Sequence, residues 1–170
     1  MCTAISYLVE KHNAKITIFP QVSMKTDTDA RVARDIIAAQ PDRIVKNIVI
    51  LGGNYSPSEL KRMYGEMDLF IGTRLHSTIF AIGMGVPSIG LVYQGTKAQG
   101  IFENIGIADM IVKDLRTTDE MIKKIDYVLS DLDQYSKMCL NGAELAKSQT
   151  MKAIESIVCE TRASLVDKSR

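Results

Sequence analysis

Short apolar runs alternate with amphipathic stretches over the first two thirds of the chain. Five runs predict strands: Lys15–Phe19, Ile44–Leu51, Asp68–Gly72, Pro87–Val92 and Asp109–Val112. Several are apolar without alternation, the pattern of a strand buried on both faces. Helical spacing predicts helices over residues 2–12, Asp29–Gln40, Ser58–Met67, Leu75–Met84 and Ala98–Ile105. The alternation predicts an α/β fold, Rossmann-like and doubly wound, with a mostly parallel five-stranded sheet.

The C-terminal third shows only helical patterns. Thr117 is followed three residues later by Glu120, the spacing of a capping box at a helix start. Two helices are expected here, separated near Asp131–Tyr135 and packed back on the sheet. Because no repeat, low-complexity segment or linker interrupts the sequence, we expect residues 1–170 to form a single domain.

Composition narrows the class of protein. Lys and Arg number 21 against 20 Asp and Glu, and this balance argues against a broad nucleic-acid-binding surface. The three cysteines, Cys2, Cys139 and Cys159, form neither a CxxC pair nor a disulfide framework, which favours a reducing compartment. No apolar run reaches the roughly 18 residues of a membrane span, and the N-terminus lacks the pattern of a signal peptide. The expected location is therefore cytoplasmic, with no transmembrane segment.

Two polar stretches have simple structural interpretations. Gly52-Gly53-Asn54 follows the second predicted strand and is typical of a tight turn. His12 lies in a Glu-Lys-His-Asn stretch, as expected of a solvated helix end. Neither stretch predicts a ligand site.

The segment Gly72-Thr73-Arg74-Leu75-His76 is the strongest candidate for a site. It lies where the third predicted strand ends, and ligands of open parallel sheets bind beyond such ends. Thr73 is expected to cap the following helix, whose first N–H groups favour an anion. Arg74 adds a planar fork for a carboxylate or phosphate, and His76 can give or take a proton. In the alternative interpretation Arg74 pairs with Asp68 and the segment is only a polar helix start.

A second polar turn, Tyr93-Gln94-Gly95-Thr96-Lys97, ends the fourth predicted strand. In many parallel sheets this strand lies beside the third. Lys97 can then offer a second cation to the same crevice, and Tyr93 a hydroxyl or a stacking face. A plain surface turn is the alternative for both.

The combination Arg74-Leu75-His76-Ser77, an apolar helix, Gly85-Val86-Pro87, a short strand, then Tyr93 and Lys97 resembles the polysaccharide pyruvyl transferase family. The resemblance covers Ser58–Ile107 and extends more weakly over Ile18–Leu51. Three residues separate Tyr93 from Lys97, where the family usually has two.

The resemblance implies one half of a GT-B-like fold and the transfer of pyruvate from phosphoenolpyruvate to a sugar, usually as a ketal. It implies that His76 is the general acid and that Arg74 and the N–H group of Leu75 hold the anionic donor. Thr73, Ser77, Tyr93 and Lys97 are the remaining substrate-binding residues that it implies. No metal or organic cofactor is required, and the partners are phosphoenolpyruvate and a glycan or lipid-linked sugar acceptor.

The resemblance also implies that these 170 residues correspond to the C-terminal, donor-binding half of a typical member. We expect an N-terminal half, or a partner chain, to cover the cleft. Two alternatives remain. One is a GT-B glycosyltransferase or sugar-nucleotide epimerase-like domain, which is disfavoured because Ser77–Met84 holds no acidic residue for sugar hydroxyls. The other is a non-catalytic module that has kept the fold.

Overall fold

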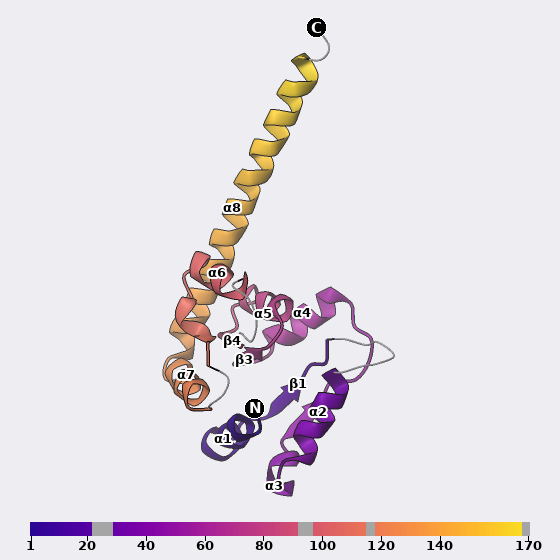
Figure 1. Ribbon diagram of the computed structural model, residues 1–170, viewed down its shortest axis with the longest axis vertical. Helices are drawn as coiled ribbons and strands as arrows, with labels where there is room; N and C mark the ends of the chain where they lie inside the picture. The colour runs from indigo at the N-terminus through magenta and orange to yellow at the C-terminus, as the bar shows by residue number, and fades with distance from the viewer. Residues whose placement is uncertain (22–28, 92–96, 115–117, 168–170) are drawn as a thin grey trace. The chain divides into compact units, whose positions relative to one another are not determined.

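The computed structural model describes residues 1–21, 29–91, 97–114 and 118–167, with side chains as far as Thr161. These residues form an α/β protein with parallel strands, which confirms the predicted fold class. The chain divides into two compact units. Unit 1 comprises Met1–Ser56 with Asp114–Lys123, and unit 2 comprises Pro57–Lys113 with Lys124–Arg170. Figure 1 shows the elements of each.

Unit 1 is a two-stranded parallel sheet with helices. Its elements are α1 (Cys2–His12), β1 (Ile16–Ile18), α2 (Asp29–Ala38), α3 (Asp42–Val45), β2 (Ile48–Ile50) and the start of α7 (Asp119–Leu129). Ile16 pairs with Ile48, and Ile18 with Ile50. The core of the unit is a small cluster of isoleucines and one valine: Ile5, Val9 and Ile44, with Ile16, Ile36 and Ile48 packed against it.

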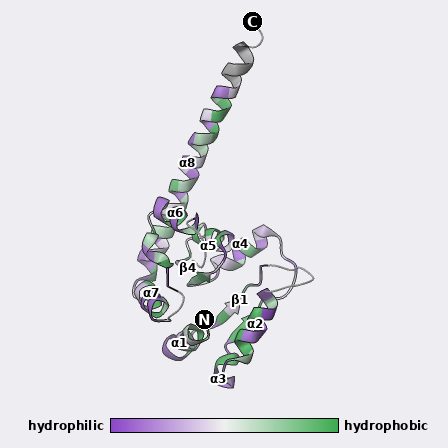
Figure 2. Ribbon diagram, viewed as in Figure 1, coloured by the Kyte–Doolittle hydropathy of each residue, from purple (hydrophilic) through white to green (hydrophobic). Residues whose placement is uncertain are grey.

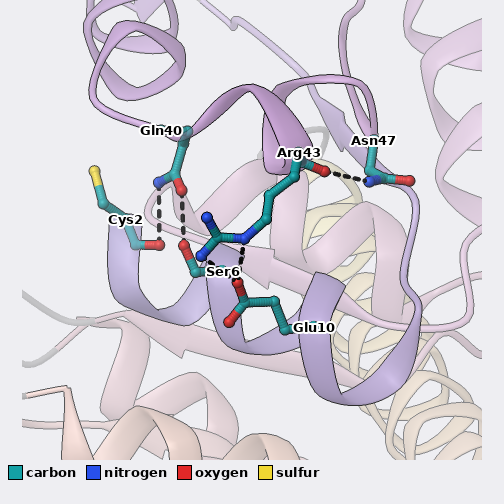
Figure 3. A network of polar contacts seen from close by, with 6 residues as sticks. All are labelled: Cys2, Ser6, Glu10, Gln40, Arg43 and Asn47. Carbon is teal, nitrogen blue, oxygen red and sulfur yellow. Dashed lines mark hydrogen bonds and ion pairs between the residues drawn. The ribbon is translucent and has the colours of Figure 1, made fainter.

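Polar contacts tie α1 to the segment between α2 and β2 (Figure 3). The Ser6 hydroxyl donates to the Gln40 side-chain oxygen at 2.8 Å, and the Gln40 amide donates to the Cys2 carbonyl at 3.1 Å. Arg43 contacts the Glu10 carboxylate through Nε at 3.0 Å and Nη2 at 2.8 Å. The contact between Arg43 and Glu10 is at the surface of unit 1, whereas Gln40 is buried.

The predicted strand Ile44–Leu51 is wrong at its start. Ile44 and Val45 belong to α3, and β2 covers only Ile48–Ile50. Pro41 precedes this short helix, and its carbonyl accepts the N–H groups of Ile44 and Val45 at 2.8 and 3.1 Å. A short apolar run does not by itself distinguish a strand from a buried helical turn, and here Ile44 is buried in the core of unit 1.

Unit 2 contains a three-stranded parallel sheet in the order β3-β4-β5. Its elements are α4 (Pro57–Gly65), β3 (Phe70–Gly72), α5 (Leu75–Ile82), β4 (Ser88–Leu91), α6 (Lys97–Asn104), η1 (Ala108–Met110), β5 (Ile111–Val112), the end of α7 and α8 (Leu132–Asp167). Every residue of β4 and β5 is buried. A strand was predicted over Asp109–Val112. The observed strand β5 begins two residues later, because Asp109 and Met110 lie in the 3-10 turn η1.

All five predicted strands are therefore present, but the hydrogen bonding differs from the prediction. Within the described ranges, the strands pair as one sheet of two and one of three, where a single five-stranded sheet was expected.

The two C-terminal helices are separated as predicted, with α7 ending at Leu129 and α8 beginning at Leu132. Thr117, the predicted cap of the first, lies outside the described residues. In α8, Tyr135 and Cys139 are buried, and the helix packs against α5. From residue 147 to 161 every side chain is exposed, and Figure 1 shows this part of α8 extending beyond the other elements of unit 2. Hydrophobic and hydrophilic positions alternate along it (Figure 2).

None of the helices in the described part of the chain combines the length and the apolar character that a bilayer crossing requires.

Candidate functional site

The candidate site lies at the carboxyl ends of β3 and β4 in unit 2. Gly72 ends β3 and pairs in register with Gly90 of β4. Beyond them is a shallow hollow with about 200 Å³ of empty space. It is lined by residues from β3, β4, α6 and the start of α5: Gly72, Thr73, Arg74, Leu75, Thr78, Gly90, Leu91, Ala98 and Phe102. The hollow is at the sheet edge where parallel α/β folds bind ligands.

The start of α5 differs in detail from the prediction. Arg74 is the N-cap residue, with an extended backbone at φ −110° and ψ 129°, and the helix begins at Leu75. The expected cap by Thr73 is therefore wrong, because the chain stays extended for one residue more. Thr73 is instead an exposed residue at the rim of the hollow. The first N–H groups of the helix have no carbonyl partner within it, so they remain donors for an anion.

Two buried hydroxyl groups converge on the carbonyl oxygen of Arg74. Ser77 Oγ donates to it at 2.9 Å and Thr78 Oγ1 at 3.0 Å, while the N–H of Thr78 donates at 3.3 Å. Both side chains are almost fully buried, at 4% and 2% exposure. Among the residues that the structure describes, no buried side-chain nitrogen or oxygen lacks a partner. The first turn of α5 is thus held by side chains as well as by its own backbone.

The structure brings three of the predicted site residues together around the hollow: Thr73, Arg74 and Leu75. His76 is the second residue of α5 and is exposed, outside the lining of the hollow. Ser77 does not line the hollow either, because its hydroxyl donates a hydrogen bond to the Arg74 carbonyl inside the helix start.

The remaining two candidates belong to the turn after β4. Lys97 is the exposed first residue of α6, next to Ala98 of the lining. Tyr93 lies outside the described residues. Both therefore keep the status of predictions from the sequence.

Sequence reasoning included Gly72 in the candidate segment but missed three other residues that line the hollow: Gly90, Thr78 and Phe102. A Cβ atom on Gly72 would lie 2.1 Å from Thr78 Oγ1, and one on Gly90 would lie 2.9 Å from Cζ of Phe102. Both glycines are therefore required for close approach of a helix to a strand end. The signal was present, since a glycine stands near the end of each apolar run, but its partners Thr78 and Phe102 come from the fold.

No group of three or more His, Cys, Asp or Glu side chains in the described ranges is arranged to hold a metal ion. The polar groups at the hollow are instead an arginine, hydroxyl groups and backbone amides, which suit an anion.

The family model for polysaccharide pyruvyl transferase matches residues 3–95, more than half of the chain. The matched span contains β3, β4 and the whole of α5. No solved structure matches the chain.

Proposed function

Because the chain belongs to the polysaccharide pyruvyl transferase family, as the sequence motifs predicted, we propose that the hollow at the start of α5 binds phosphoenolpyruvate. The bound donor then passes its pyruvyl group to a sugar of a glycan or a lipid-linked acceptor. The observation that carries this proposal is the placement of Arg74, Leu75 and the open N-terminus of α5 at one edge of the buried sheet.

The chemistry of the hollow suits such a donor. Phosphoenolpyruvate carries a carboxylate and a phosphate, and a guanidinium fork binds either group with two parallel hydrogen bonds. The amide groups of Leu75 and His76 and the helix dipole add donors for the second anionic group. Both anionic groups of phosphoenolpyruvate thus have donors of a suitable kind at this edge of the sheet.

His76 is the proposed proton source. It lies one residue after Leu75 in the first turn of α5 and is exposed to incoming substrates. Proton transfer from its imidazolium to C3 of the enol converts the methylene to a methyl group and leaves an oxocarbenium-like centre at C2. A first sugar hydroxyl adds at C2 and releases its proton. The C–O bond to phosphate then breaks, and inorganic phosphate leaves with the bonding electron pair. A second hydroxyl of the same sugar attacks C2 and loses its proton, which completes the ketal.

The alternative of a nucleotide-sugar-binding domain finds no support at this helix. The residues of α5, Leu75–Ile82, include no carboxylate to hold ribose or sugar hydroxyls. A non-catalytic module can keep the same anion site. Only a measurement of turnover therefore distinguishes it from the proposed transferase.

Donor binding is tested by titrating the chain with phosphoenolpyruvate and, separately, with a UDP-sugar. A ligand at 100 times its Kd stabilises the folded chain by about 2.7 kcal/mol, which calorimetry detects as a higher melting temperature. We expect this response for phosphoenolpyruvate, its loss in Arg74→Ala, and a weakened response in Arg74→Lys, which keeps the charge but not the fork. Arg31→Ala, on an exposed arginine of α2, is the control. A response to the UDP-sugar alone would contradict the proposal.

Proton delivery is tested without knowledge of the acceptor. In D₂O, reversible protonation at C3 exchanges the methylene hydrogens of phosphoenolpyruvate for deuterium, which NMR follows directly. We expect exchange with the wild-type chain and none with His76→Asn, while His76→Asn binds the donor with a similar Kd. His12→Asn serves as the control on the other histidine. Exchange that survives in His76→Asn would exclude this residue as the acid.

A further inference from the structure

We propose that Thr78 is a positioning residue for the donor site: its buried hydroxyl fixes the peptide between Arg74 and Leu75, so that the Leu75 N–H points into the hollow. This inference rests on the proposed function, because it assigns a role in binding the same anion. It names a residue that the sequence did not single out, and it gives the Ser77 hydroxyl a supporting role at the same carbonyl.

The geometry of one peptide unit carries the argument. The carbonyl of Arg74 and the N–H of Leu75 belong to the same planar trans peptide, in which C=O and N–H point in opposite directions. The carbonyl is turned into the helix, where it accepts the hydroxyls of Ser77 and Thr78 at 2.9 and 3.0 Å. The N–H of Leu75 is therefore directed out of the helix start, on the side where Leu75 lines the hollow.

Thr78 is the more constrained of the two hydroxyl donors. It lines the hollow, whereas Ser77 does not, and it is 2% exposed. Its Oγ1 occupies the space beside Gly72, where a Cβ atom would come within 2.1 Å. The hydroxyl is thus held between the end of β3 and the Arg74 carbonyl. Since a buried hydroxyl without a partner costs free energy, its hydrogen bond to the Arg74 carbonyl favours this position.

A rigid amide matters because a donor that is already oriented loses little entropy when the anion binds. The two hydroxyls pre-orient the Leu75 amide by fixing the other end of its peptide. Removal of the Thr78 hydroxyl leaves the carbonyl with the Ser77 hydroxyl at 2.9 Å and the longer contact of the Thr78 N–H at 3.3 Å. The peptide is then held less firmly, and the Leu75 amide is less rigidly oriented.

The first measurement needs no ligand. The ¹⁵N order parameter of the Leu75 amide reports how rigidly this peptide is held, with about 0.85 typical of rigid backbone and values below about 0.6 of flexible backbone. We expect a high value in the wild-type chain, a clear fall in Thr78→Val, which has the same shape without the hydroxyl, and recovery in Thr78→Ser. An unchanged order parameter in Thr78→Val would overturn the positioning role.

The second measurement uses phosphoenolpyruvate and inorganic phosphate as probes in calorimetric titrations. We expect Thr78→Val to raise the Kd for phosphoenolpyruvate about five- to tenfold, as for the loss of one well-placed hydrogen bond, and Thr78→Ser to stay within about twofold of wild type. Ser88→Ala is the matched control: Ser88 is also buried, its Oγ donates to the Val86 carbonyl at 2.8 Å, and it does not line the hollow. It should lower stability and leave the Kd unchanged.

The outcomes separate the two proposals. If the wild-type chain binds neither probe, the proposed function fails and with it the role of Thr78 in donor binding, while the order parameter of Leu75 still decides whether Thr78 holds this peptide. If Thr78→Val and Ser88→Ala weaken binding equally, the effect is general destabilisation and the inference fails. Should Thr78→Val not fold, Ser77→Ala removes the other hydroxyl from the same carbonyl and must shift both readouts in the same direction.

Discussion

The two parallel sheets of the chain differ in what surrounds their strands. In unit 2, every residue of β4 and β5 is buried, and the end of β3 is fixed by the contact of Gly72 with the first turn of α5. In unit 1, β1 and β2 are only partly buried, and Val49 is 62% exposed. The strand ends of unit 2 are thus held from several sides, and the candidate site is located there. A buried sheet gives a binding group a fixed position that a half-exposed sheet does not.

The largest difference in the free energy of unfolding is expected when the same substitution, valine to alanine, is made once in each sheet. Val112→Ala in β5 removes two methyl groups from a side chain with 0% exposure, which should lower the free energy of unfolding by about 2–3 kcal/mol. Val49→Ala in β2 should change it by less than about 0.5 kcal/mol, because the side chain is already in water. Urea unfolding of the two variants measures the difference. Equal losses would show that the sheets do not differ in this way.

The next largest contrast is expected between two glycines, Gly72 at the end of β3 and Gly52 after β2. In Gly72→Ala the new Cβ would meet Thr78 Oγ1 at 2.1 Å and Cε1 of Phe70 at 2.7 Å, so the helix start must shift. Overpacking of this kind costs about 1–3 kcal/mol. Gly52, after β2, has no atom within 4 Å of such a Cβ, and Gly52→Ala should be nearly neutral. Thermal unfolding compares the two, and a neutral Gly72→Ala would mean that the contact between β3 and α5 is loose.

Cysteine reactivity tests how well α8 covers the buried sheet. Cys139 is fully buried in α8 against the backbone of Ser88, and burial raises the pKa of its thiol to about 11. A raised pKa leaves less of the reactive thiolate at pH 8. We expect an aromatic disulfide reagent to label the exposed Cys159 at once and Cys139 only after unfolding. Mass spectrometry identifies the labelled residue. Prompt labelling of Cys139 in the folded chain would show that α8 leaves the sheet open.

The same difference explains which elements the sequence could predict. The runs that became β3, β4 and β5 are continuously apolar because they are buried, and this pattern located all three with small errors at their ends. Ile44 was misassigned because a buried helical turn is as apolar as a strand. The pairing into two sheets depends on contacts between distant residues, for which the sequence carries no local signal.

The candidate site was predictable to the same extent. Arg74 was found because a charged side chain at a strand end breaks the apolar pattern, and Leu75 was found through the family motif that contains it. Both residues line the hollow. Thr78 was missed because an uncharged hydroxyl inside a helix resembles any other core position. Its contact with Gly72 joins two residues six positions apart that only the turn of the chain brings together. The cap by Thr73 failed because one further extended residue moved the helix start.

The smallest effect is expected at the surface of unit 1, where Arg43 of α3 contacts Glu10 of α1 at 2.8 Å. Both side chains are largely in water, at 68% and 48% exposure, so a double-mutant cycle with Glu10→Ala and Arg43→Ala should give a coupling of about 0.2–1 kcal/mol. Salt at 1 M should reduce it further. The pair Arg31–Asp35, at 3.9 Å within α2, is the control and should show less. A coupling above about 2 kcal/mol would mean that polar contacts stabilise unit 1 as strongly as burial stabilises unit 2. The two units would then differ in the type of interaction that stabilises them and not in its strength.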